Sequence, residues 1–186
     1  MKKHIFLLIC LVFNFGCQQH KERKAFSGNL KFQTNDPARL YFKNIRSVAY
    51  YKTRKQHSEL DIYQLKKKAQ TDKRPIIHPI IVDNWIDNEA YLFLEKNEYQ
   101  QFFDPLTVKV EQDTSMAIFE INVFNKNNQY EFANKIFAAL KARQPLTVKN
   151  KAGAFVPIYD NYQDKSNFMT TMTDYFRFIE LERKRK

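Results

Sequence analysis

The sequence predicts an α+β domain in which about three helices pack on one face of a mostly antiparallel sheet of about six strands. Short segments that alternate apolar and polar side chains crowd the middle of the chain, and segments with a helical period lie before and after them. The chain of 186 residues contains 17 Phe and 10 Tyr, which is ample apolar material for one core. We therefore expect a folded domain rather than a disordered chain.

The first helix is expected over residues 36–45. Asp36 can cap its start, and Pro37 fits the first helical turn, where a missing N–H leaves no hydrogen bond unmade. Its large apolar side chains share one face: Leu40, Tyr41 and Ile45.

Strand patterns follow over most of the chain. The expected strands cover residues 47–52, 59–65, 76–83, 89–95, 106–111 and 116–124, and a later hairpin is formed by 146–149 and 154–158. The first two strands form a hairpin that turns near 56–58, and the four between 76 and 124 form an antiparallel meander. Pro79 predicts that its strand lies at an edge or is broken, because proline has no N–H to donate. Gly153 can adopt the positive φ that the last hairpin turn needs.

A change of period marks the second helix, which is expected over 128–142. Asn128 can cap its start together with Glu131, three residues later. Its apolar face consists of Ala133, Ile136, Phe137 and Leu140. A third helix is expected over 166–182. Its apolar stripe contains Phe168, Met169, Met172, Tyr175, Phe176 and Ile179.

The start of the chain has the pattern of an export signal. Residues 2–4 are basic, and residues 5–13 form an unbroken apolar run. This run is shorter than the roughly 20 apolar residues that a transmembrane helix needs. Gly16 places a small residue immediately before Cys17, directly after the run. The pattern resembles the lipobox of bacterial lipoproteins.

The resemblance implies that Cys17 carries a diacylglyceryl group and that the signal, residues 1–16, is removed. Residues 17–28 then form a lipidated tether, and residues 29–186 form a single α+β domain. Gln18 stands where many lipoproteins retained in the inner membrane have aspartate. The resemblance therefore implies an anchor in the cell envelope, at the outer membrane if the organism is Gram-negative.

The match departs from the common lipobox at Asn14 and Phe15, where an aliphatic and a small residue are more usual. Cys10 is a poorer acceptor, because bulky Ile9 precedes it and the apolar run continues past it. Cys10 leaves with the signal, so a lipidated Cys17 leaves no cysteine for a disulfide within the domain.

The sequence lacks the motifs that several kinds of binding or catalytic site need. There are only 3 Gly, so a glycine-rich phosphate loop is excluded, and no Gly-x-Ser-x-Gly nucleophile motif is present. His20, His57 and His78 are isolated in the sequence, so we expect no metal site and no cofactor. His57, Glu59 and Asp61 alternate along one strand edge, which we interpret as a solvated polar face.

Two pairs of carboxylates flank predicted turns: Asp83 with Asp87, and Asp160 with Asp164. Paired carboxylates can hydrolyse glycans, which makes a hydrolase acting on envelope glycans the runner-up function. Turn chemistry explains aspartate at these positions without catalysis. We therefore expect no catalytic residue.

Aromatic residues at sheet rims and loop ends are the stronger indication of function, because such side chains often bind partners. The candidates for partner binding are Trp85, Tyr50, Tyr51, Tyr159 and Tyr162. The alternative for Trp85 is that it folds back over the core.

The formal net charge is +11, and removal of the two lysines in the signal lowers it to +9. Basic charge interleaved with aromatics favours nucleic acid in a cytoplasmic protein, but export removes that expectation. The basic chain end is expected to contact an anionic surface through Arg183, Lys184, Arg185 and Lys186. The leading interpretation is a non-catalytic envelope lipoprotein that binds a partner protein or an envelope polymer.

Overall fold

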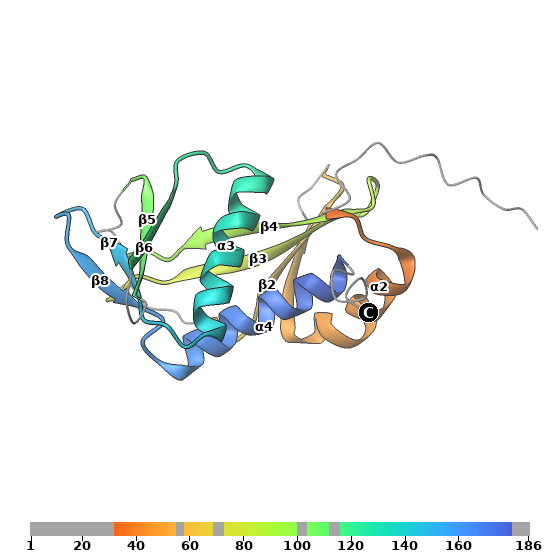
Figure 1. Cartoon of the computed structure of the whole chain (residues 1–186). Coiled ribbons are helices and arrows are strands. Elements are labelled where there is room, and N and C mark those ends of the chain that lie inside the picture. Colours follow the sequence, from red (N-terminus) through yellow and green to blue (C-terminus); the bar gives the residue numbers. More distant parts are fainter. Residues whose placement is uncertain (1–31, 55–57, 69–72, 100–103, 112–115, 180–186) are drawn as a thin grey trace, which may run out of the picture.

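The computed structural model describes residues 32–54, 58–68, 73–99, 104–111 and 116–179. Its class is α+β, with two antiparallel sheets of four strands each and three α-helices in the described residues. The class is as expected, but the expectation of one sheet of about six strands is wrong. Figure 1 shows α3 and α4 lying across the first sheet, with the second sheet at one end and α2 at the other.

The first sheet has the order β1–β2–β3–β4. Its strands are β1 Tyr50–Arg54, β2 Leu60–Leu65, β3 Ile77–Asn84 and β4 Glu89–Lys96. The second sheet has the order β6–β5–β7–β8. Its strands are β5 Leu106–Glu111, β6 Met116–Ile121, β7 Leu146–Lys149 and β8 Phe155–Ile158.

The expected meander from 76 to 124 breaks between β4 and β5, where the chain passes from one sheet to the other. Residues 97–105 join these strands, and this connection is longer than the about two to five residues of a tight hairpin. The two hairpins expected from the sequence are present, since β1 pairs with β2 and β7 pairs with β8. Gly153 has the expected positive φ, of 83°.

β3 lies between β2 and β4, so the expectation that Pro79 marks an edge or broken strand is wrong. Pro79 stands opposite Leu94 of β4, whose N–H donates to Gln129 Oε1 instead of to β3. In an antiparallel pair, the nitrogen of Pro79 therefore points toward the β2 side. The β2 pairing has already ended there, at Ile81, so the ladder loses no hydrogen bond.

Each of the three α-helices in the described residues has an asparagine as its N-cap. Asn35, Asn125 and Asn161 have extended backbones, and each side chain accepts a hydrogen bond from a backbone N–H three residues later. The helices are α2 Asp36–Tyr41, α3 Lys126–Lys141 and α4 Tyr162–Phe178. The expected caps Asp36 and Asn128 are therefore wrong, and α4 begins earlier than expected. α2 continues as a π turn, η3 Phe42–Arg46, and a 3-10 turn, η4 Ser47–Ala49.

The buried apolar side chains form one core drawn from both sheets and from η3, α3 and α4. α4 contacts β3 and β4, while α3 contacts β4 and also reaches β6 and β7 of the second sheet. The ring of Phe42 in η3 stacks on Phe178 at the end of α4, with 4.7 Å between ring centres. This contact fixes the first helical segment, residues 36–49, against the last helix.

Candidate functional site

The first helical segment, residues 36–49, turns its three cationic side chains inward beside Phe42 and leaves four large apolar side chains exposed. Arg39, Lys43 and Arg46 all reach buried carboxylates. Its large exposed side chains, which we call the outer stripe, are Leu40, Tyr41, Ile45 and Val48, with 45% to 66% of each exposed. A surface helix normally has the opposite arrangement. The apolar face recognised in the sequence is thus the outer one.

An aspartate pair lies beneath this segment. Asp61 of β2 and Asp83 of β3 stand opposite each other in the sheet. Both side chains are fully buried, at 0% exposure. The phase of β2 is therefore the reverse of that expected for a solvated polar face: Asp61, Tyr63 and Leu65 point inward, while Ile62 is only partly buried. The expectation of a solvated Asp61 is wrong, and His57 lies outside the described residues.

Four cations surround the aspartate pair. Arg54 and Lys52 hold Asp61, with 2.7 Å from Arg54 Nε to Oδ1 and 2.8 Å from Lys52 Nζ to Oδ2. Arg39 Nε lies 3.2 Å from Asp83 Oδ1. Lys43 Nζ lies between the two carboxylates, 3.5 Å from Asp83 Oδ2 and 3.9 Å from Asp61 Oδ2. The cluster therefore has more positive than negative charge.

The two carboxyl groups have opposite pKa shifts. Burial raises the pKa of Asp83, and Arg39 and Lys43 oppose this only in part. Burial also acts to raise the pKa of Asp61, but hydrogen bonds from Arg54 and Lys52 outweigh it and lower that pKa below its usual value. Acid–base catalysis uses such split pairs. Here, however, the described residues leave neither carboxylate exposed to a substrate.

A second inward ion pair fixes the end of the same segment. Arg46 donates to Asp174 of α4 through two nitrogens, at 2.7 and 2.9 Å. The hydroxyl of Tyr50 in β1 donates to the same carboxylate at 2.7 Å. Burial, followed by the charge of Asp174, raises the pKa of Tyr50 far above its usual value. Asp174 thus joins η3, β1 and α4.

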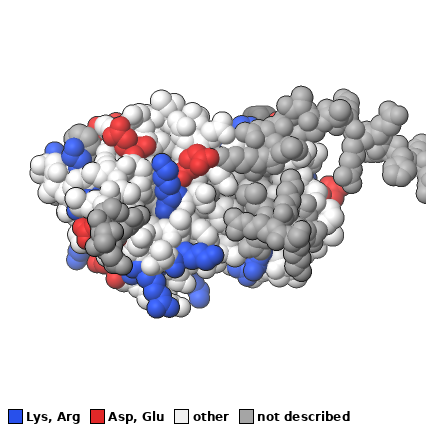
Figure 2. Space-filling view, in the orientation of Figure 1, with Lys and Arg blue, Asp and Glu red and all other residues white. Residues whose placement is uncertain are grey.

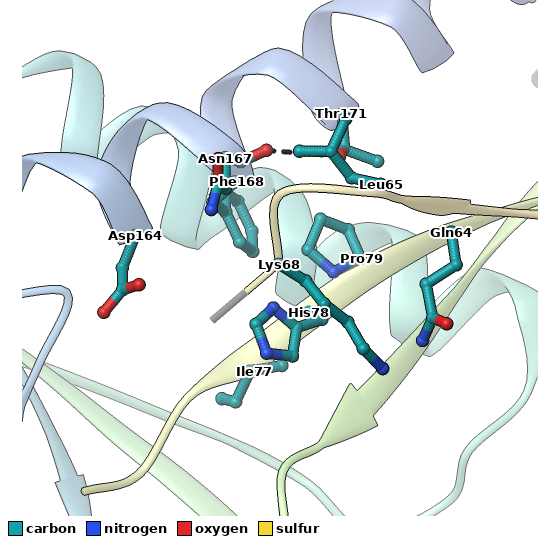
Figure 3. Close-up of a pocket in the computed structure, with 10 residues that line it drawn as sticks. All are labelled: Gln64, Leu65, Lys68, Ile77, His78, Pro79, Asp164, Asn167, Phe168 and Thr171. Carbon is teal, nitrogen blue, oxygen red and sulfur yellow. Dashed lines mark hydrogen bonds between the residues drawn. The ribbon is translucent and has the colours of Figure 1, made fainter. Parts of the chain in front are cut away.

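A third ion-pair cluster lies at the start of α4. Arg74 binds Asp160 and Asp164, with nitrogen to oxygen distances of 2.8 Å for each. A cavity of about 10 Å³ lies beside it, between α4 and β3, which holds about one water molecule and no larger ligand. Figure 3 shows its lining residues: Gln64, Leu65, Lys68, Ile77, His78, Pro79, Asp164, Asn167, Phe168 and Thr171.

A wider surface groove of about 360 Å³ lies where β6 meets α3. Its lining residues are Glu120, Ile121, Asn122, Val123, Asn128, Glu131, Phe132 and Lys135. The charges in this groove are of both signs, and it contains no convergent set of catalytic groups. Lysine and arginine side chains on the visible face are scattered, and some of them lie beside acidic side chains (Figure 2).

The five aromatic candidates divide into two kinds. Tyr50 and Tyr159 are buried, so the expectation that they are exposed is wrong; each donates its hydroxyl inward, Tyr50 to Asp174 and Tyr159 to the carbonyl of Ile77. Tyr51 and Tyr162 are exposed. Trp85 is 42% exposed in the β3–β4 turn, so it does not fold fully back over the core. The three exposed rings lie on different elements.

The carboxylates of the hydrolase alternative do not converge. Asp83 lies at the end of β3 and Asp87 in the turn that follows, whereas Arg74, just before β3, holds Asp160 and Asp164. A strand of eight residues separates the two ends by roughly 25 Å. The carboxylate opposite Asp83 is that of Asp61, which was expected on a solvated strand face and not in a catalytic pair.

Sequence reasoning missed the inward charges, although one signal was present. Arg39, Lys43 and Arg46 recur at intervals of four and three residues, which places them on one helical face. A charged stripe beside an apolar one normally faces solvent, so the pattern alone does not show which face is buried. Nothing in the local sequence of Asp61 or Asp174 marks it as the buried partner.

Cys17 and the basic end, Arg183, Lys184, Arg185 and Lys186, lie outside the described residues. Within the described part of the chain, no helix is long and apolar enough to cross a membrane, and no group of His, Cys, Asp and Glu side chains is placed to hold a metal ion. Comparison with protein-family models, with curated proteins and with solved structures gave no match.

Proposed function

We propose that this chain is a cell-envelope lipoprotein, anchored by lipid on Cys17, whose folded domain is a non-catalytic binding module. The observation that carries the binding role is the outer stripe, an apolar surface of four large side chains on one helical segment. Soluble monomers rarely expose contiguous apolar patches larger than a few hundred Å², and patches of that size commonly mark interaction sites. The lipobox-like start of the chain supports the anchor.

The inward side of the segment supports a structural role for its charges. Arg39, Lys43 and Arg46 are held by buried aspartates, so they position the segment with the outer stripe outermost. The exposed Tyr51, Trp85 and Tyr162 are further candidates for partner contact, each on a separate surface. The partner is a protein, a polymer or a surface of the envelope. In a Gram-negative organism, Gln18 next to the lipidated cysteine favours the outer membrane as the site of the anchor.

The alternative proposal is a hydrolase acting on envelope glycans. One observation favours it, namely the opposite pKa shifts of Asp61 and Asp83. Against it stands their burial beneath four cations, which leaves no room for a sugar ring between them. The two proposals differ in a direct assay: a hydrolase releases reducing ends from purified envelope glycan, and Asp61→Asn or Asp83→Asn abolishes the release.

The anchor is tested by metabolic labelling of the full chain with a radioactive fatty acid. We expect Cys17→Ser to lose the label and to move from the membrane to the soluble fraction, because one residue carries all the acyl chains. The matched control is Cys10→Ser, which removes the other cysteine and is expected to keep the label. Label that persists on Cys17→Ser would overturn the proposal.

A further inference from the structure

We propose that the outer stripe docks onto an anionic lipid bilayer, with Leu40, Tyr41, Ile45 and Val48 inserted among the headgroups. This inference rests on the proposed function, in that lipid on Cys17 holds the domain beside a membrane. It goes further by assigning the surface that meets the bilayer.

The composition of the outward face fits an interfacial helix. Among the exposed residues of 36–49, only Asp36 at the very start is charged, and Asn44 is the only other polar residue on that face. The four stripe residues recur at helical spacing over a segment about 20 Å long. Helices that lie in a membrane surface bury such a face about 5 to 10 Å deep. An aromatic ring such as Tyr41 suits the headgroup level.

Chain connectivity favours a bilayer over a protein partner. The segment that leads from Cys17 enters the described fold at Phe32, three residues before Asn35, the N-cap of α2. At the other end of the chain, Phe178 stacks on Phe42 of η3, so the residues leading to the basic end leave the fold beside the same segment. The first and last described stretches of the chain therefore both adjoin the segment that carries the outer stripe.

Charge around the stripe adds to this argument. The cluster beneath it has four cations for two carboxylates, and the side chains of Lys52 and Arg54 remain 44% and 56% exposed. Four more basic residues follow at 183–186. Each basic residue close to an anionic membrane contributes about 1 kcal/mol of attraction. An anionic bilayer thus matches both the apolar stripe and the excess of positive charge in the cluster beneath it.

The test is co-sedimentation with vesicles of phosphatidylglycerol and phosphatidylethanolamine, and with neutral vesicles of phosphatidylcholine. The protein is the chain from residue 17 onward with Cys17→Ser, which keeps every described residue and has no lipid of its own. We expect binding to the anionic vesicles that weakens with salt, because headgroup attraction is screened beyond about 8 Å at physiological ionic strength.

The decisive variant is Ile45→Ser with Val48→Ser, which we expect to weaken vesicle binding about tenfold or more. The matched control is Met116→Ser with Ile118→Ser, which removes two equally exposed apolar side chains, 69% and 60% exposed, from β6. The control is expected to bind as the parent does. Thermal melting of both variants confirms that each is folded.

Three results would overturn the inference. Equal binding by the Ile45/Val48 variant and the parent would remove the stripe from the contact, and no binding to anionic vesicles would remove the membrane. Concentration-dependent association without vesicles, lost in the Ile45/Val48 variant, would assign the stripe to a second copy of the chain. Because the protein tested has no lipid, failure here leaves the fatty-acid labelling result intact, and the two proposals can fail separately.

Discussion

The first helical segment and the last helix pack against each other through Phe42 and Phe178, yet they present opposite kinds of surface. In α4 the apolar side chains Phe168, Met172 and Tyr175 are buried, and its exposed positions include Lys165 and Arg177. In residues 36–49 the cations point inward and the outer stripe is exposed. An apolar helical period therefore identifies a face, but it does not say which way that face points.

The direction in which the apolar face of a helix points depends on the element that the helix packs against. α4 meets the apolar inner face of β3 and β4, so burial of its own apolar stripe stabilises the fold. The first segment instead meets two strands and a helix that carry buried aspartates: Asp61, Asp83 and Asp174. Burial of a carboxylate without a neighbouring cation raises the free energy of the folded state. The segment is therefore most stable when it is rotated about its axis so that Arg39, Lys43 and Arg46 face these aspartates.

The largest expected effect comes from removing the carboxylate shared by the two helical segments. Asp174→Ala leaves Arg46 and Tyr50 without their common acceptor, and we expect a loss of about 3 kcal/mol in the free energy of unfolding, at the lower end for breaking a buried pair because Arg46 keeps some exposure. Urea denaturation measures this. Asp36→Ala, whose side chain is fully exposed, is the control and should change little. A loss under 1 kcal/mol would mean that the ion pair does not orient the segment.

A smaller loss is expected where α3 meets α4. Phe137 is only partly buried and meets Phe176 edge to face, with 5.2 Å between ring centres. A fully buried phenylalanine costs about 3 to 5 kcal/mol on replacement by alanine, so we expect Phe137→Ala to cost about 2 kcal/mol. Thermal and urea unfolding check this value. A loss as large as that of a fully buried ring would place Phe137 in the core, as the helical period alone predicted.

The aspartate pair predicts two pH dependences of opposite sign. The pKa of Asp61 is lowered, so its contribution to stability is present above about pH 3.8, the usual aspartate value, and is lost as the pH falls through its folded pKa. The pKa of Asp83 is raised, so its contribution is present below that value and is lost as the pH rises through its folded pKa.

Urea denaturation of the parent, Asp61→Asn and Asp83→Asn between pH 3 and 7 separates the two groups, in a range set by the usual carboxyl pKa. The advantage of the parent over Asp61→Asn should shrink toward the acid end, whereas its advantage over Asp83→Asn should shrink toward neutral pH. If both stability advantages changed with pH in the same direction, the surroundings would not be shifting the pKa values of Asp61 and Asp83 in opposite directions.

The features predicted correctly from the sequence are those that a local pattern of residues determines. The helix expected over 128–142, the stripe of α4 and both hairpins follow from periodicity and turn residues, and each is present. The break between β4 and β5 could not be predicted, because strand alternation does not say which sheet a strand joins. The central place of Pro79 depends on where the β2 ladder ends, which is a property of the pairing.

The candidate site was predictable only in part. The helical spacing of Leu40, Tyr41 and Ile45 was visible, but its outward direction depends on aspartates that lie far away in the sequence, the most distant of them Asp174. Tyr50 and Tyr159 have polar ends, and the sequence gives no sign that these ends find acceptors within the core. Exposure of an aromatic residue was thus inferred from its neighbours in sequence, while its neighbours in space decide it.

The smallest expected effect is also the sharpest test of the contrast between the two helical segments. Ile45→Ser removes an aliphatic side chain that is 56% exposed, so we expect the free energy of unfolding to change by less than about 0.5 kcal/mol. Met172→Ser, at 0% exposure on α4, is the matched change on the opposite surface and should cost several times more, because it leaves a cavity and buries a hydroxyl. Urea unfolding of the two variants side by side gives the comparison.

A loss for Ile45→Ser as large as that for Met172→Ser would mean that the stripe is already buried in solution, either by another part of the chain or by a second copy. Only burial by a second copy would make the loss depend on protein concentration. A negligible loss leaves the stripe available to a bilayer, because a surface that stabilises nothing within the fold can be covered without unfolding any of it.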